Sequence, residues 1–146
     1  MPVRIRPFRK EDAKPVLELA NKYAAFDGVT TEADLAVTAH FRQGFWVAED
    51  RGKVVGFVYG YFRDVPGEVL DRWESNKVGQ VDLMSVHPGY RRSGVGRSLL
   101  TRLLREFKKA GADLAILNCP AVASEAKALY DDLGFDVRAY QMKKRL

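Results

Sequence analysis

Apolar residues follow two spacings along this chain, and the alternation between them predicts an α/β fold. Runs rich in β-branched and aromatic residues, typical of strands, occupy residues 3–8, 45–49, 53–62, 80–86, 112–118 and 136–144. Apolar positions three and four residues apart, typical of amphipathic helices, occupy about residues 11–25, 30–41, 95–110 and 124–133. We expect a mixed, mostly antiparallel sheet with helices on both faces, in which a helix joins the two parallel strands.

Glycines and small polar residues set the boundaries between these elements. Residues 50–52 (Asp-Arg-Gly) predict a hairpin turn. Gly56 and Gly60, inside the next strand, predict bulges or a close approach of other backbone. Ser124 is expected to cap the last helix, and Gly134 to end it.

Length and composition exclude several classes of protein. With 146 residues, 47% of them hydrophobic, the chain fits one packed domain, and no apolar run approaches the ~20 residues of a membrane span. A single cysteine, Cys119, and the lack of a signal-peptide pattern are typical of a cytoplasmic protein. We expect Cys119 to be a small buried side chain at a strand end. The two histidines, His40 and His87, lack metal-ligand spacing, so no metal site is expected.

The net charge of +5 indicates an anionic partner, which could be nucleic acid, a membrane surface or an anionic cofactor. The distribution of the basic residues helps to separate these three. The main basic cluster comprises Arg91, Arg92, Arg97, Arg102, Arg105, Lys108 and Lys109. A smaller group follows at residues 143–145. No basic stripe with interleaved aromatic residues is present, so the pattern favours a small phosphate-bearing ligand over nucleic acid.

Residues 91–98 combine the features of a phosphate-binding loop. Two glycines stand in a basic turn between a strand and an amphipathic helix, whose free N–H groups and dipole attract anions. The binding residues expected here are Arg91, Arg92, Ser93, Gly94, Val95, Gly96, Arg97 and Ser98. The spacing fits neither a nucleotide P-loop nor a dinucleotide-binding fingerprint.

Two motifs, in this order, resemble the GNAT family of N-acetyltransferases. The first is Arg91-x-x-Gly94-x-Gly96, preceded by a strand and Val86-His87-Pro88-x-Tyr90. The second is the run Ala-Leu-Tyr-Asp-Asp-Leu-Gly-Phe over residues 128–135. The resemblance spans essentially the whole chain and implies one N-acetyltransferase domain over residues 1–146. It also implies acetyl-CoA as cosubstrate and direct transfer of the acetyl group to a primary amine.

The resemblance further implies how the pantetheine arm of the cofactor is held. In the family, the strand before the loop carries a bulge and splays from its parallel neighbour, which leaves backbone groups free to bind the arm. The positions here are Met84, Ser85 and Val86. The family often has an asparagine seven residues before the tyrosine of its second motif. Ala123 stands there instead, which leaves Asn118 and Ser124 as candidate contacts.

Tyr130 is the tyrosine of the second motif and the candidate general acid. Without the motif, a tyrosine on an apolar helix face is typical of the core. The resemblance implies that it lies near the thioester sulfur, where a phenol can protonate the departing thiolate.

Asp82 is a carboxylate in the predicted central strand. A buried charge there is costly unless it is paired or has a function. Strand alternation groups Gln80, Asp82, Met84 and Val86 on one face and Val81, Leu83 and Ser85 on the other. Two readings stay open. Asp82 holds or deprotonates the acceptor's ammonium group, with partial burial raising its pKa, or it forms an ion pair with a covering helix. Glu74 is the reserve candidate for the base.

The acceptor amine, free or protein-borne, is left open. In the family the first helical pair borders the acceptor site. The residues that could contact the acceptor here are Tyr23, Phe26, Asp27, His40 and Phe41. The alternative is that each is an ordinary core or surface residue. The acidic connection over residues 64–79, with room for one short helix, either selects a cationic amine or is a solvated loop. An acyl-CoA sensor without turnover, a basic nucleic-acid-binding protein and a homodimer also stay open.

Overall fold

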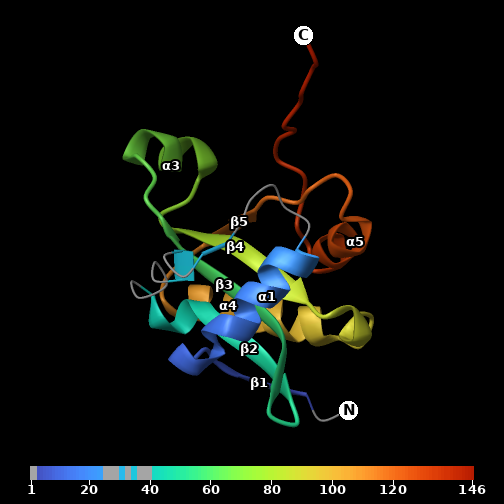
Figure 1. The fold of residues 1–146 in the computed structure, drawn as a ribbon. Coiled ribbons are helices and arrows are strands. Elements are labelled where there is room, and N and C mark those ends of the chain that lie inside the picture. Colours follow the sequence, from blue (N-terminus) through green and yellow to red (C-terminus); the bar gives the residue numbers. More distant parts are fainter. Residues whose placement is uncertain (1–2, 25–29, 32–33, 36–40) are drawn as a thin grey trace.

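A five-stranded sheet forms the centre of the molecule. The computed structural model describes residues 3–24, 30–31, 34–35 and 41–146. The strands are β1 (Arg4–Pro7), β2 (Phe45–Asp50), β3 (Lys53–Arg63), β4 (Val78–Val86) and β5 (Leu114–Leu117), and they lie side by side in that order (Figure 1). Neighbours from β1 to β4 are antiparallel, and β4 and β5 are parallel. The predicted mixed, mostly antiparallel sheet is confirmed.

Helices cover both faces of this sheet. The α-helices are α1 (Ala13–Tyr23), α3 (Gly67–Trp73), α4 (Val95–Lys109) and α5 (Ser124–Asp132), and short 3-10 turns occupy Lys10–Asp12, Arg42–Gly44 and Pro88–Tyr90. In Figure 1, α1 crosses the front of the sheet and α4 lies behind it. Most of the helix predicted over residues 30–41 lies outside the described residues, as do Phe26, Asp27 and His40. No helix of the described part combines the length and apolar character needed to cross a membrane.

The core consists of two layers, one on each side of the sheet. On the α4 side, Leu99, Leu100 and Leu103 are fully buried and pack with Val58 of β3. The layer on the α1 side joins Val16, Leu19 and Ala20 of α1 to Val47 and Phe57 of the sheet. The amphipathic spacing that predicts the two helices therefore reflects the burial of one face of each against the sheet.

The glycines of β3 mark close approaches, as predicted. A Cβ atom at Gly60 would lie 2.7 Å from the Phe107 ring of α4, and one at Gly56 would lie 3.3 Å from the Leu99 side chain. The hairpin turn is confirmed as well, because Arg51 and Gly52 have φ angles of 53° and 80°. Two consecutive positive φ angles are typical of the tight turn that fits twisted strands.

A bulge at Asp82 interrupts the pairing of β3 with β4. Tyr59 pairs with Leu83 and Gly60 with Val81, so Asp82 has no partner residue in β3. The predicted grouping of β4 side chains is correct for residues 83–86 and wrong across the bulge, because the extra residue reverses the alternation between Val81 and Leu83. Val81, Met84 and Val86 pack together on the α4 side, whereas Leu83 packs on the α1 side.

Two predictions for the last part of the chain are wrong. Residues 136–144 form no strand, since nothing in the described chain pairs with them, and the chain rises away from the body (Figure 1). Ser124 does not cap α5. It is the first helical residue, and the cap position is Ala123, with no side-chain hydrogen bond.

A buried ion cluster attaches the chain before α1 to the sheet. The Arg6 guanidinium donates to both carboxylate oxygens of Asp12, at 2.8 and 2.9 Å, and to Glu49 of β2 at 3.2 Å. Arg6 and Asp12 are each 6% exposed. Burial alone would raise the pKa of Asp12, but the hydrogen bonds from Arg6 and from the Arg9 backbone N–H outweigh it and lower the pKa.

We expect Asp12→Asn to destabilise the fold by about 3 kcal/mol at pH 7, because it leaves a buried guanidinium with one carboxylate partner fewer. The folded-state pKa of Asp12 is lowered, so its contribution is complete above the unfolded value of about 4 and is lost as the pH falls below it. Urea denaturation at several pH values tests this. The gap between wild type and variant should shrink below about pH 4, and exposed Asp136→Asn is the control. A gap that is constant with pH would contradict the assignment.

Candidate functional site

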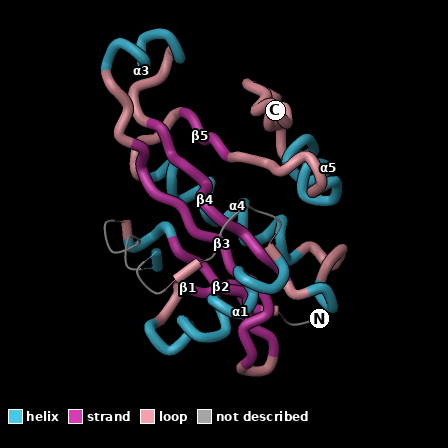
Figure 2. The backbone as a smooth tube through the Cα atoms, turned by 45° about the horizontal axis from the view of Figure 1, so that its top comes forward, coloured by secondary structure: helices cyan, strands magenta, loops and turns pink. Residues whose placement is uncertain are grey.

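Within the residues that the structure describes, the edge of β4 toward β5 is unpaired over residues 82–86. The ladder between the two strands ends at Val81 and Leu117, and beyond it the chain after β5 turns away toward α5 (Figure 2). The N–H of His87 donates to the Val55 carbonyl at 2.8 Å, on the β3 side. Backbone groups alternate in direction along a strand, so Met84 and Val86 point theirs toward the unpaired edge. We call residues 82–86 on this side the open edge of β4.

The loop after β4 delivers the chain to an uncapped helix N-terminus. Gly94 is the N-cap of α4, with φ of 86° and no side-chain cap. A Cβ atom built at Gly94 would meet nothing within 4 Å, so the space in front of the helix is open. The first N–H groups of a helix have no partner within it. They are therefore available here, with the positive end of the helix dipole, to an anion.

Gly96 lies where the open edge, α4 and α5 meet. A Cβ atom at this position would lie 3.5 Å from the Leu129 side chain of α5 and 3.8 Å from Met84 and from Val86. The predicted loop, the strand before it and the second motif are therefore brought together around one short stretch of backbone.

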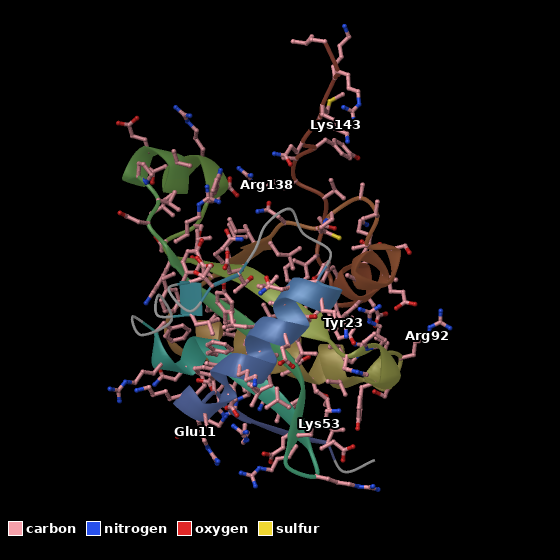
Figure 3. All side chains as sticks on the ribbon, viewed as in Figure 1. Glu11, Tyr23, Lys53, Arg92, Arg138 and Lys143 are labelled. Atoms are coloured by element: carbon pink, nitrogen blue, oxygen red, sulfur yellow. The ribbon has the colours of Figure 1, made fainter. Side chains whose placement is uncertain are left out.

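Three arginines surround the loop. Arg91 donates to the carbonyls of Val86, at 3.3 Å, and of Tyr23, at 3.4 Å. Arg92 and Arg97 pair with Glu125 and Asp132 of α5. Figure 3 shows Arg92 extending from the loop into solvent. Exposed ion pairs of this kind contribute little to stability, so both arginines can exchange their carboxylates for phosphate oxygens at low cost.

One contact that sequence reasoning missed holds the loop in place. The Tyr90 hydroxyl donates to the Asp50 carboxylate of the β2–β3 hairpin at 2.5 Å, and this hydrogen bond raises the pKa of Tyr90. Asp50 is 8% exposed, and its other oxygen has no hydrogen-bond partner among the described residues. The two residues are 40 positions apart in the sequence, so no local pattern predicts that they pair, and only the fold reveals it. The ring of His87 also has a structural role, since its Nδ1 accepts the Gly89 N–H at 3.0 Å.

Tyr130 lies on α5 with its ring against the core. The ring contacts Phe135 edge-on, with centroids 5.9 Å apart, and the residue packs on the α4 side of the core. Burial, with a smaller contribution from Cys119, raises the pKa of Tyr130 to about 12. The hydroxyl is therefore fully protonated at neutral pH and can donate a proton. Within the described chain it has no hydrogen-bond partner.

Asp82 is exposed, and this overturns the partial burial expected of it. Burial raises the pKa of Tyr59 of β3, and the neighbouring Asp82 carboxylate raises it further. Burial and the charge of Asp82 raise the pKa of Tyr61 as well. Among the described residues no lysine or arginine lies within 4.0 Å of Asp82, so the predicted ion pair with a covering helix is wrong.

The structure also places the remaining candidate residues and Cys119. The Ser85 hydroxyl donates to the Leu19 carbonyl of α1 at 3.1 Å, on the far face of the sheet. Asn118 and Ser124 are exposed, one after the end of β5 and one at the start of α5. Glu74 ends α3 in a left-handed conformation and is exposed. Cys119 is half-buried, and burial raises the pKa of its thiol.

Comparison with known proteins identifies this arrangement. Residues 12–135 match the model of the Acetyltransferase (GNAT) family. The chain belongs to the GNAT acetyltransferase family. The predicted recognition is confirmed.

Individual relatives differ in what they are named for. The mycothiol acetyltransferase of Amycolatopsis mediterranei is 34% identical over 92 residues, which cover 63% of this chain and 30% of that protein. The chain thus spans about a third of the length of this relative. The structure of Ard1 from Thermoplasma volcanium has a TM-score of 0.79 at 24% identity, covering 95% of this chain and 86% of that one. The ribosomal-protein-alanine N-acetyltransferase of Brucella melitensis biovar Abortus 2308 has a TM-score of 0.72 at 25% identity and covers 100% of both chains.

Proposed function

We propose that this chain transfers the acetyl group of acetyl-CoA to a primary amine. The observation that carries the proposal is the meeting of three features around Gly96: the open edge of β4, the uncapped N-terminus of α4 and the helix that holds Tyr130. A thioester cofactor with a phosphate group and an amide-containing arm needs an anion site, free backbone groups and an acid for the thiolate.

Each part of the cofactor has a matching part of the site. The pyrophosphate binds the N–H groups at the start of α4, with Arg91 and Arg92 beside them. The backbone groups of Met84 and Val86 on the open edge pair with the amides of the pantetheine arm. One of these N–H groups, directed at the thioester carbonyl, stabilises the oxyanion that forms during attack.

The transfer of acetyl to an ammonium group requires three proton movements, and the proposal assigns a residue to the first and the last. The acceptor ammonium loses one proton to Asp82, directly or through a water, and the neutral amine forms a bond to the acetyl carbon. The nitrogen then loses a second proton to solvent, the carbon–sulfur bond breaks, and Tyr130 gives its proton to the thiolate. Solvent restores the phenol and takes the proton from Asp82. No covalent enzyme intermediate is needed.

The acceptor is a primary amine of cationic character. Asp82 stands beside Tyr59 and Tyr61, and no cation among the described residues lies within salt-bridge distance of its carboxylate, so an ammonium group can be its partner. Similar proteins have different names, a mycothiol acetyltransferase in one case and a ribosomal-protein-alanine N-acetyltransferase in another. Thiol release from acetyl-CoA, measured against small amines, polyamines and peptides with free N-termini, distinguishes these classes. Binding of acetyl-CoA without thiol release in any of them would favour a sensor instead.

We expect acetyl-CoA at about 100 times its Kd to raise the Tm by about 5–10 °C, and Gly94→Asp to abolish this shift. The substitution places a side chain and a negative charge in the open space before α4. Gly111→Asp is the matched control, because Gly111 also has a positive φ (97°) with nothing within 4 Å, at the opposite end of the same helix. Differential scanning fluorimetry of both variants is the measurement. An equal shift in both would contradict the phosphate site.

A further inference from the structure

Asp50, the last residue of β2, is a buried carboxylate that takes no part in the proposed reaction. One of its oxygens accepts the Tyr90 hydroxyl at 2.5 Å, and within the described chain the other has no hydrogen-bond partner. A buried carboxylate with an unpartnered oxygen costs stability, and a neutral group could accept the same hydroxyl at a lower cost. The charge does strengthen the hydrogen bond. This favours a role in which Tyr90 must be held firmly.

The loop that follows Tyr90 has an unfavourable backbone conformation. Arg92 has a φ angle of 62°, and Gly94, the N-cap of α4, has one of 86°. A positive φ is uncommon in a residue with a side chain, and it persists where surrounding contacts determine it. The path of the chain into α4 therefore depends on contacts from outside the loop.

Tyr90 joins this loop to the β2–β3 hairpin through its side chain and its backbone together. The hydroxyl is bound to Asp50, and the Tyr90 carbonyl accepts a hydrogen bond from the Ser93 hydroxyl. Ser93 directly precedes Gly94. Two hydrogen bonds in series thus connect a buried carboxylate of the sheet to the residue before the N-terminus of α4.

We propose that Asp50 and Tyr90 are positioning residues for acetyl-CoA, an inference that rests on the proposed function. Their hydrogen bond fixes the loop so that the first N–H groups of α4 already point at the phosphate groups when the cofactor arrives. A loop ordered in advance does not have to be ordered by the ligand, and the saving appears as affinity. The thioester lies at the other end of the cofactor. The pair should therefore change the binding of acetyl-CoA and leave the rate of transfer in the bound state unchanged.

Steady-state kinetics of a double variant test the pair. Asp50→Leu with Tyr90→Phe removes the hydrogen bond and leaves no buried charge unpaired, so the fold is retained. We expect the KM for acetyl-CoA to rise by about ten- to a hundredfold, as for loss of a hydrogen bond to a charged group, with kcat unchanged. Asp50→Asn keeps an oxygen for the Tyr90 hydroxyl and should raise KM by no more than about threefold. An unchanged KM, or a fall in kcat as large as the rise in KM, would overturn the proposal.

An acetyl donor without phosphate groups separates positioning from a general loosening of the fold. S-acetylpantetheine at millimolar concentration has the thioester but not the pyrophosphate. The double variant should therefore keep its kcat/KM with this donor while its kcat/KM with acetyl-CoA falls. An equal fall with both donors would show that the hydrogen bond only supports the fold, and would overturn the proposal.

Ser75→Ala is the matched control, because it also removes a hydrogen bond from a hydroxyl to a distant carboxylate. Ser75 lies before β4, at the end away from the phosphate loop, and donates to Asp113 at 2.5 Å. The variant should lower the Tm and keep the ratio of kcat/KM between the two donors. If wild-type protein neither binds acetyl-CoA nor releases thiol from it, the proposed function itself is wrong, which is a different result from an equal fall with both donors.

Discussion

Tyr130→Phe is expected to lower kcat for acetyl transfer by about 10²- to 10⁴-fold, with little change in the KM for acetyl-CoA. The substitution removes one hydroxyl and leaves the ring, whose edge-on contact with Phe135 belongs to the core. Because burial raises the pKa of Tyr130 to about 12, the wild-type phenol is protonated across the working pH range. The variant therefore loses a proton donor and little packing.

Steady-state kinetics with two thioester donors separate this role from a structural one. A donor with an acidic thiol releases a stable thiolate that needs no proton, so the loss caused by Tyr130→Phe should shrink with an aryl thioester. Tyr140→Phe, at an 82% exposed position, is the control and should keep its kcat. If the loss were the same for both donors, the phenol would not protonate the leaving group.

The elements that sequence reasoning locates correctly are those whose signal lies within one segment. The amphipathic spacing of α4, the basic glycine loop before it and the hairpin at Arg51-Gly52 each depend on neighbours in sequence. The loop and the helix form one continuous stretch, so the glycine N-cap and the start of α4 could be predicted from it, while binding of an anion there stays a prediction. The open edge of β4 depended on the family resemblance, because strand spacing alone does not say where a ladder ends.

The errors arise where two distant segments decide the outcome. The bulge at Asp82 is one extra residue of β4 relative to β3, which the apolar pattern of β4 alone does not reveal. The same bulge exposes Asp82 and sets it beside Tyr59, a pair that strand alternation does not predict. Residues 136–144 have the composition of a strand, but a strand requires a partner, and nothing in the described part of the chain pairs with them. The link from Tyr90 to Asp50 was missed for the same reason.

Asp82→Asn is expected to lower kcat/KM for the amine by about 10²-fold at pH 7, because the variant can neither accept a proton nor attract an ammonium group. Stability should change little, since the side chain is exposed and makes no ion pair among the described residues. The acetyl-CoA thermal shift should persist, because the proposed phosphate site lies beyond the end of β4, at residues 91–98. Asp71→Asn, at an exposed acid on α3, is the control for general loss of negative charge.

The pH dependence decides whether Asp82 acts on the acceptor's proton. As the pH rises toward the pKa of the amine, more of the acceptor is already neutral, so the loss in Asp82→Asn should shrink. Tyr59→Phe removes the hydroxyl beside the carboxylate but keeps the charge of Asp82, so it should lower kcat/KM less than Asp82→Asn. If Glu74→Gln instead caused the loss and its pH dependence, the proton would go to the end of α3. If Asp82→Asn keeps full activity but has a much lower Tm, Asp82 stabilises the fold and takes no part in the reaction.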